Sequence, residues 1–370
     1  MGQGKKVRYA VVGLGHIAQV AVLPAFAHAS KNSILTALVS GNQNKLRQLA
    51  RRYGLSRTYT YDQYDACLES GEVDAVYIAL PNDMHCNFTL RAARAGVHVL
   101  CEKPLASTVE ECRKIEQAAR RHKIKVMTAY RLHFEEANLR AIELVRSGKL
   151  GEPRIFNSVF TMQVTDPNNI RLKRRRGGGT LFDIGVYCIN AARYIFRAEP
   201  LQVFAFSANN GEKRFREIDE MTSAVLRFPG DRLASFTCSF GAADVASFQV
   251  VGTKGTLELS PAYEYAEGLE QVLKLGDKEE KKYYPKRDQF APELIAFSDA
   301  ILKKKEIEPS ALEGLIDVQI VTALYESART GRPVRLRIEK AKRRPSLKQM
   351  ITCPPVRKPE VIQSRSPHPE

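Results

Sequence analysis

The sequence lacks most features that mark a secreted, metal-binding or membrane-inserted protein. Its seven cysteines include no CxxC pair and no zinc-ligand spacing, and most lie among apolar residues. No apolar run reaches the roughly 18 residues that a membrane-spanning helix needs. Residues 1–6 are too few and too polar for a signal peptide, because strand-like residues begin at Val7. We therefore expect buried free thiols, no bound metal, no membrane insertion and a cytoplasmic location.

Acidic residues are also scarce relative to basic ones, since 57 Lys and Arg against 41 Asp and Glu give a net charge of +16. Such an excess can indicate nucleic-acid binding. Residues 337–370, however, contain nine Lys or Arg and three Asp or Glu, which places +6 of the excess in a Pro-rich tail. No aromatic–basic repeat or helix-turn-helix pattern occurs. We expect a surface-charge effect, no specific nucleic-acid partner and a disordered tail.

The first informative pattern is a glycine-rich turn between a strand and a helix. Residues 6–12 read as a strand and lead into Gly13-Leu14-Gly15-His16-Ile17-Ala18, a GxGxxA sequence that opens a helical stretch. Gly13 permits a tight turn, Gly15 lets the backbone approach a pyrophosphate, and Ala18 permits close packing of helix on sheet. Free N–H groups at the helix N-terminus favour the phosphates. The pattern predicts a dinucleotide site at residues 13–17.

A carboxylate is missing where NAD-preferring proteins place one. The second strand, residues 34–39, ends in Ser40-Gly41-Asn42-Gln43-Asn44-Lys45, which offers no Asp or Glu to bind the ribose 2′-hydroxyl. Ser40 and Asn42 supply neutral hydrogen bonds and Lys45 supplies positive charge. This set suits a 2′-phosphate and predicts NADP(H). The alternative is a polar helix cap with Lys45 on a solvated helix face.

Strands and helices alternate from residue 7 to about 129, which predicts a doubly wound parallel sheet. One apolar strand stops at Glu102-Lys103-Pro104, because proline cannot continue a central ladder. Ligands of such sheets bind outside the carboxyl ends of the strands, so Lys103 is a candidate acid/base or substrate clamp. Pro81-Asn82 is expected at the same edge. The alternative for Glu102 and Lys103 is a surface ion pair.

Beyond residue 130 the alternation gives way to consecutive strands. From residue 201 to 259 strand-like segments follow one another without helices, which predicts a mostly antiparallel sheet in an α+β domain. The broad face of this sheet is a candidate surface for a homo-dimer or homo-tetramer. We expect three regions: an NADP-binding Rossmann domain at 6–129, an α+β substrate and oligomerisation domain at 130–336, and the tail at 337–370.

A second candidate site follows Gly177-Gly178-Gly179. Asp183 and Tyr187 are four residues apart where a helix should begin, so both side chains share one face. A carboxylate beside a tyrosine hydroxyl, with a lysine nearby, is a suitable proton-transfer set for interconverting C–OH and C=O. The alternative is Asp183 as a helix N-cap and Tyr187 as a packed aromatic residue.

These patterns belong to a longer series. The sequence contains five motifs in this order: Gly13-x-Gly15-x-x-Ala18, Pro81-Asn82-x-x-His85, Glu102-Lys103-Pro104, Tyr130-Arg131-x-His133 and Gly177-Gly178-Gly179-x-x-x-Asp183-x-Gly185-x-Tyr187. Over about residues 6–336 the series resembles the Gfo/Idh/MocA oxidoreductases. Ser40-Gly41-Asn42-x-x-Lys45 and Tyr187-Cys188-x-Asn190 make the chain most similar to the family's glucose–fructose and aldose oxidoreductase group.

The resemblance implies a role for each matching residue. Lys103 would contact the reacting carbonyl or hydroxyl and the nicotinamide ribose. Tyr187 would be the acid/base, and Asp183 would bind the sugar and support Tyr187. Arg131 and His133 would also touch the sugar.

The same resemblance implies the cofactor contacts. Ser40, Lys45 and Tyr61, together with Gly41 and Asn42, would hold the adenosine phosphate. The nicotinamide side would be lined by Leu80, Pro81, Asn82, His85, Glu102, Lys103, Arg131 and Arg171.

Two departures narrow what the resemblance implies. The glucose–fructose group has a tryptophan just before Arg171-Leu172, but this chain has Ile170 there and no tryptophan anywhere. An export signal and a long N-terminal arm are also missing, so a non-dissociating NADP and a periplasmic location are not expected.

The leading hypothesis is an NADP-dependent oxidoreductase that oxidises C1 of an aldose, of glucose or xylose type, to a lactone, with a second sugar as a candidate acceptor. One alternative is a dehydrogenase of another polyol or cyclic alcohol with exchangeable NAD(P). The other is a non-catalytic NADP-sensing regulator, against which the presence of both Lys103 and Tyr187 speaks.

Overall fold

The computed structural model describes residues 5–341, 343–364 and 366. They form two compact units, and each unit is interrupted in sequence. The expected domains were contiguous, whereas helix α8 (Ala291–Leu302) and part of the tail belong to the first unit. Unit 1 comprises the described parts of 1–131, 288–314 and 352–366, and unit 2 those of 132–287 and 315–351.

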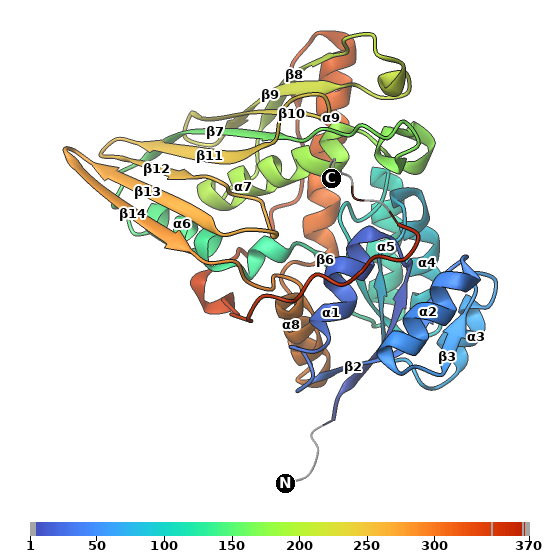
Figure 1. Ribbon diagram of the computed structural model, residues 1–370. Helices are drawn as coiled ribbons and strands as arrows, with labels where there is room; N and C mark the ends of the chain where they lie inside the picture. Colours follow the sequence, from blue (N-terminus) through green and yellow to red (C-terminus); the bar gives the residue numbers. More distant parts are fainter. Residues whose placement is uncertain (1–4, 342, 365, 367–370) are drawn as a thin grey trace. The chain divides into compact units, whose positions relative to one another are not determined.

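Unit 1 is built on a six-stranded sheet in the order β3-β2-β1-β4-β5-β6 (Figure 1). Neighbouring strands pair in parallel throughout. The strand order reverses between β1 and β4, which is the switch point where α/β sheets bind ligands. The predicted doubly wound Rossmann sheet is confirmed. Its strands are β1 (Val7–Val12), β2 (Ser33–Val39), β3 (Arg57–Tyr59), β4 (Ala75–Ile78), β5 (His98–Glu102) and β6 (Val126–Ala129).

The central strands of this sheet are apolar because helices cover them. All residues of β4 and β6 are buried, as expected for a parallel sheet covered on both faces. Asn42 and Thr108 cap helices α2 and α5, each accepting a hydrogen bond from a backbone N–H three residues on. The helices are α1 (Leu23–Ala25), α2 (Gln43–Tyr53), α3 (Tyr64–Glu69), α4 (Asn82–Arg94), α5 (Val109–Arg121) and α8.

Unit 2 is built on a nine-stranded sheet in the order β14-β13-β12-β11-β7-β10-β9-β8-β15. Among the strand pairs that the described residues form in this sheet, only β7 and β10 pair in parallel, so the predicted mostly antiparallel sheet is confirmed. The strands are β7 (Pro153–Thr161), β8 (Gln202–Ala208), β9 (Met221–Phe228), β10 (Arg232–Ser239), β11 (Val245–Gly252), β12 (Thr256–Leu259), β13 (Leu269–Leu275), β14 (Lys278–Tyr284) and β15 (Val334–Arg335).

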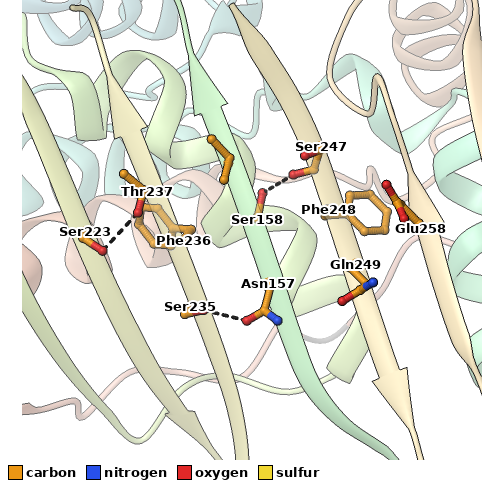
Figure 2. Close-up of a pocket in the computed structure, with 11 residues that line it drawn as sticks. Asn157, Ser158, Ser223, Ser235, Phe236, Thr237, Ser247, Phe248, Gln249 and Glu258 are labelled. Atoms are coloured by element: carbon orange, nitrogen blue, oxygen red, sulfur yellow. Dashed lines mark hydrogen bonds between the residues drawn. The ribbon is translucent and has the colours of Figure 1, made fainter. Parts of the chain in front are cut away.

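Helices cover one face of the nine-stranded sheet. Helix α7 (Val186–Phe196) packs on β7, and α6 (Glu136–Arg146) packs on β12 and β13. The long helix α9 (Ala311–Thr330) follows α8 in the chain. On the other face, polar side chains line a hollow of about 360 Å³ (Figure 2). There Ser235 donates to Asn157 at 2.7 Å, and Ser223 and Thr237 share a hydrogen bond of 3.0 Å.

The tail does not meet the expectation of disorder where the structure describes it. Cys353 and Ile362 are 6% and 8% exposed, and Arg344 forms an ion pair with Glu199. In Figure 1 the tail of unit 1, in dark red, passes along α1. A few apolar anchors and backbone hydrogen bonds hold this segment, although its composition alone indicates disorder. Residues 342, 365 and 367–370 of the tail lie outside the described residues.

The cysteine side chains were expected to be buried free thiols, and the structure confirms this. All seven cysteines lie in the described part of the chain, and all are buried and unpaired with one another. In that same part, no group of three or more His, Cys, Asp or Glu side chains is arranged to hold a metal ion. None of its helices is both long enough and apolar enough to span a membrane.

Candidate active site

The glycine-rich turn lies at the carboxyl end of β1, and Gly13 makes its tightest point. Gly13 has a φ of +93°, a left-handed conformation that strains any residue with a Cβ. A Cβ at this position would lie 2.4 Å from the carbonyl oxygen of Ala79 and 3.0 Å from the Leu80 side chain. The turn therefore passes against the chain that leaves β4, at the switch point of the sheet.

Gly15 has different surroundings, because a Cβ there would meet no atom within 4 Å. Its carbonyl accepts a hydrogen bond of 3.2 Å from the N–H of Gln19, where the helical segment 18–25 begins with a π-helical turn. Open space thus adjoins the first N–H groups of a helical segment, which is how such turns bind a pyrophosphate. Leu14, His16 and Ile17 belong to the same turn. These residues fit a dinucleotide cofactor.

Alanine substitutions distinguish the roles of Gly13 and Gly15. We expect Gly15→Ala to change the free energy of unfolding by no more than about 0.5 kcal/mol, because open space receives the methyl group. The same methyl group should weaken NADPH binding about tenfold or more, since it occupies the place assigned to the pyrophosphate. Gly13→Ala should instead destabilise the fold by about 1–3 kcal/mol through backbone strain. Thermal unfolding and NADPH titration measure both; normal binding by Gly15→Ala would place the pyrophosphate elsewhere.

The turn after β2 gathers the residues predicted to hold the adenosine phosphate. Ser40 is only 3% exposed, and its Oγ accepts a hydrogen bond from the Asn42 N–H at 3.2 Å. Asn42 in turn accepts from the Lys45 N–H at 3.0 Å, so the helix-cap alternative describes Asn42 correctly. Lys45 is half-buried rather than fully solvated, and burial lowers the pKa of its ammonium group. Gly41 lies against the ring of Tyr61, 3.0 Å from where its Cβ would be.

His85 joins the turns that follow β4 and β5. Its Nδ1 lies 2.8 Å from the carbonyl oxygen of Pro104, and its Nε2 lies 2.9 Å from that of Leu80. The ring is fully buried, and this burial lowers its pKa. His85 therefore positions the Leu80–Pro81 and Lys103–Pro104 turns, and its expected place on the nicotinamide side stays a prediction. Asn82 follows as the first residue of α4.

Glu102 points into a hydrogen-bonded network, so the surface ion-pair alternative does not describe it. The Tyr77 hydroxyl donates to Glu102 Oε1 at 2.9 Å, and the Lys103 N–H donates to Oε2 at 3.3 Å. Burial raises the pKa of Glu102, although Lys103 and Tyr77 oppose the rise. Glu293 of α8 is fully buried, and burial followed by the charge of Glu102 raises its pKa well above the ordinary value. Lys103, the residue that follows β5, is half-buried.

Arg131 and His133, expected to touch the sugar, are both buried in a short 3-10 turn, Arg131–His133. In unit 1 Arg131 donates to the side-chain oxygen of Gln289. In unit 2 His133 packs edge-on against Tyr194, with ring centroids 4.4 Å apart, and its Nε2 bonds to the Tyr194 hydroxyl and lies 3.3 Å from Asn190 Oδ1. These contacts assign both residues a positioning role.

Asp183 lies in a π-helical turn, Leu181–Gly185, that leads directly into α7. Its Oδ2 accepts a hydrogen bond of 2.6 Å from Arg171 Nε, in an ion pair whose side chains are 30% (Arg171) and 18% (Asp183) exposed. The N-cap position is Thr180, so the N-cap alternative for Asp183 is wrong. The preceding glycines allow the close approach, since a Cβ on Gly178 would lie 2.3 Å from the Arg171 carbonyl oxygen.

Tyr187 is the second residue of α7, four residues after Asp183. Its half-buried ring lies edge-on to Phe160 at 5.5 Å and tilted against Tyr263 at 5.9 Å. The packed-aromatic alternative is therefore also correct for the ring. Gly185 lets the turn sit close to the sheet, because a Cβ there would lie 3.3 Å from Cys238 Sγ. This packing fixes Tyr187 relative to the Asp183–Arg171 pair.

A buried ionic cluster around Arg193 of α7 was not predicted from the sequence. Arg193 donates to Asp317 at 2.6 Å and to Glu199 at 2.6 Å, and the three side chains are 0%, 0% and 5% exposed. Asn190 donates to the other oxygen of Asp317 at 2.7 Å, which links the cluster to His133. Arg193 and Asp317 are 124 residues apart in the chain, so no local sequence signal could pair these two side chains.

One family model matches the chain over the first sheet, and a second matches it over part of the second sheet. Residues 7–130 match the model described as an oxidoreductase family with an NAD-binding Rossmann fold. Residues 138–258 match the GFO/IDH/MocA C-terminal domain. Together the two matches span more than half of the chain.

Individual relatives are similar along nearly their whole length. The chain is 31% identical to a D-xylose 1-dehydrogenase [NADP(+)] of Haloarcula marismortui, over 89% of this chain and 93% of the relative. An aldose-aldose oxidoreductase from Caulobacter crescentus, crystallised with glycerol, is 36% identical with a TM-score of 0.86, and 90% of this chain and 100% of that chain are covered. A 3-ketoreductase from Actinomadura kijaniata, solved with NADP and TDP-benzene, is 27% identical with a TM-score of 0.80, over 87% and 98% of the two chains.

Proposed function

Since the chain belongs to the Gfo/Idh/MocA oxidoreductase family, we propose that it is an NADP-dependent enzyme that oxidises C1 of an aldose, of glucose or xylose type, to a lactone. The observation that carries the proposal is the placement of Tyr187 one helical turn after the Asp183–Arg171 ion pair. A proton acceptor and a fixed carboxylate on one short helical segment suit an alcohol substrate with several hydroxyl groups. The names of the xylose and aldose relatives support the same substrate class.

In the proposed reaction the C1–H bond breaks with its electron pair while the C1 hydroxyl loses its proton. When bound, NADP accepts that pair as hydride. Tyr187 takes the hydroxyl proton as the C=O bond forms. By the family resemblance we assign to Lys103 a hydrogen bond to the reacting oxygen. Asp183 binds a neighbouring sugar hydroxyl, and Arg171 fixes the carboxylate orientation. With a second sugar as acceptor, Tyr187 would give the proton back to the carbonyl oxygen of that sugar as it becomes a hydroxyl.

The residues assigned to the cofactor follow the turns described above. Gly13, Gly15 and their neighbours would hold the pyrophosphate, and the Ser40–Lys45 turn with Tyr61 would hold the adenosine ribose and its 2′-phosphate. Leu80, Pro81, Asn82 and Glu102 would lie on the nicotinamide side, with His85 holding their turns in place. The preference for NADP rests on the lack of a carboxylate in the Ser40–Lys45 turn.

Lys45→Ala tests the cofactor assignment. We expect it to weaken NADP binding about 10- to 150-fold, because a charge-assisted hydrogen bond to phosphate contributes roughly 1.5–3 kcal/mol. NAD binding should change little, since NAD has no 2′-phosphate. Arg47→Ala removes an exposed cation two residues along the same helix and is the matched control. Fluorescence titration of the wild type and both variants with NADPH and NADH gives the dissociation constants, and equal losses for both nucleotides in Lys45→Ala would discredit the assignment.

The reaction itself is tested by initial rates with D-glucose, D-xylose and a cyclic polyol, each with NADP and NAD. We expect the highest kcat/KM for an aldose with NADP and a lactone as the product. A preference for the cyclic polyol would retain an oxidoreductase but reject the aldose. NADP binding without turnover of any alcohol would favour a regulator.

We also propose that copies of the chain associate through the open face of the nine-stranded sheet. This face carries exposed apolar side chains, with Ile155, Val225, Leu233 and Val245 each 42–47% exposed. Between them lie the polar pairs that line the hollow in Figure 2. A contiguous surface of this kind is typical of a contact between protein subunits rather than of a surface facing only water.

A further inference from the structure

The tail segment Glu360–Gln363 is attached to the glycine-rich turn through one buried glutamine. Gln19 is 1% exposed, and its Nε2 donates to the Leu14 carbonyl oxygen at 2.9 Å and to that of Ile362 at 3.0 Å. Its Oε1 accepts a hydrogen bond of 2.8 Å from the Ile362 N–H. The side-chain amide thus pairs with both backbone groups of Ile362 as a neighbouring strand would. The same amide holds the turn assigned to the pyrophosphate.

Two further contacts place the segment along α2. Arg52, in the last turn of α2, donates to the Glu360 carbonyl oxygen at 2.7 Å. Asn42, at the start of α2, donates from its Nδ2 to Gln363 Oε1 at 3.1 Å. The segment therefore contacts both of the turns that the proposed function assigns to the cofactor, the one at Leu14 and the one at Asn42.

Gln363 adopts an unfavourable backbone conformation at this contact. Its φ is +46°, a left-handed value that costs about 1 kcal/mol or more in a residue with a side chain. Asparagine or glycine would adopt this φ more easily. Strain of this kind persists where surrounding contacts hold the residue, and it marks positions worth testing for function.

The docked segment leaves the proposed nucleotide positions open. Apart from its two chain neighbours, no atom of the described residues lies within 4 Å of a Cβ built on Gly15, and the atoms nearest to a Cβ on Gly41 belong to the Tyr61 ring. A segment that competed with the nucleotide for its place would fill these positions. The contacts instead suit a segment that is docked while the nucleotide is bound.

From these contacts we infer that residues 360–363 form part of the nucleotide site and slow the release of its adenosine end. The inference rests on the proposed use of NADP(H). Gln19 couples the segment to the pyrophosphate turn, and Gln363 fixes the Asn42 cap next to the 2′-phosphate position. By linkage, bound nucleotide must stabilise the docked segment by the same factor by which the segment stabilises bound nucleotide.

Gln363→Gly in the full chain is the sharpest test, because it removes the side-chain contact and relieves the positive φ together. We expect an unchanged or higher melting temperature with NADPH dissociation about 3- to 10-fold faster in stopped-flow fluorescence. Lys358→Ala is the matched control, since Lys358 is exposed and lies outside residues 360–363; its dissociation rate should not change. A purely structural segment would give the opposite pattern, with altered stability and unaltered release.

A chain ending at Pro359 provides a second variant, with an expected acceleration of release larger than that of Gln363→Gly. Trypsin cleavage after the exposed Arg357 supplies a readout without the variants, and saturating NADPH should slow it in the intact protein. Unchanged release from both variants, or tighter binding by the shortened chain, would overturn the inference. Wild-type protein that binds neither NADPH nor NADH would instead refute the proposed function.

Discussion

Tyr187→Phe is expected to reduce kcat for aldose oxidation by about 10²- to 10⁴-fold, the range that general acid–base catalysis supplies. The substitution removes one hydroxyl group and keeps the ring. Contacts with Phe160 and Tyr263 should therefore persist, and the fold and the Asp183–Arg171 pair should remain intact. NADPH binding should change less than about twofold, because no cofactor contact is assigned to Tyr187.

The control for this experiment is Tyr283→Phe, which removes the same atom from a tyrosine of β14 that is 65% exposed. Its kcat should match the wild type. Steady-state kinetics with NADP and the best aldose, together with NADPH titration of each variant, give the comparison. An unchanged kcat for Tyr187→Phe would remove Tyr187 from the proton-transfer step, and a large loss of NADPH affinity would indicate structural damage instead.

The second large effect is on stability. Asp317→Ala is expected to lower the free energy of unfolding by about 3–5 kcal/mol, because it leaves the fully buried Arg193 guanidinium without one of its two carboxylates. It also removes the acceptor of the Asn190 amide. Urea unfolding measures the change, provided that the variant folds well enough for a baseline.

A surface pair serves as its reference. Glu110→Ala breaks the exposed i,i+4 pair with Lys114 and should leave the unfolding midpoint nearly unchanged. If Asp317→Ala were no more destabilising than Glu110→Ala, the buried cluster would contribute nothing beyond a solvated pair. Arg193→Met with Asp317→Leu should recover much of the loss, because no isolated charge remains buried.

The same cluster makes stability depend on pH. Burial alone would raise the pKa of Glu199, but Arg193 and Arg344 hold that pKa below its ordinary value. A carboxylate with a depressed pKa in the folded state contributes stability that is present above its unfolded pKa. That contribution is lost as the pH falls through the folded pKa, so acid should destabilise the wild type.

Local patterns were enough to predict the first sheet and its glycine-rich turn. Gly13 and Gly15 could be identified because their roles depend on a few neighbouring residues and on the strand before them. One proline predicted that this strand would end at Lys103, and β5 ends one residue earlier, at Glu102. The consecutive strands of the second sheet could be read from alternation, although the β13–β14 hairpin was missed because β14 is a charged edge strand.

Contacts between distant residues could not be predicted. Gln19 is an ordinary polar residue in a helical stretch until Ile362, 343 residues away, pairs with it. The tail has few apolar residues, and this composition indicates disorder. Composition carries no information about the hydrogen-bond partners that the tail finds elsewhere in the chain. His85 and His133 carried motif positions, but only the structure shows that both are buried and bonded within the protein. For Asn42 the structural alternative is confirmed, since Oδ1 caps the helix and the amide group contacts Gln363, while its assignment to the cofactor stays a prediction.

The most direct measurement is the absorbance spectrum of freshly desalted protein before and after addition of D-glucose or D-xylose, first without NADP and then with it. The reduced-nicotinamide band is expected to grow in the presence of sugar and NADP, and Tyr187→Phe should suppress this growth. Growth without added NADP would show in addition that the cofactor is retained. A protein that binds NADPH yet gives no band with either aldose would contradict the proposed sugar oxidation.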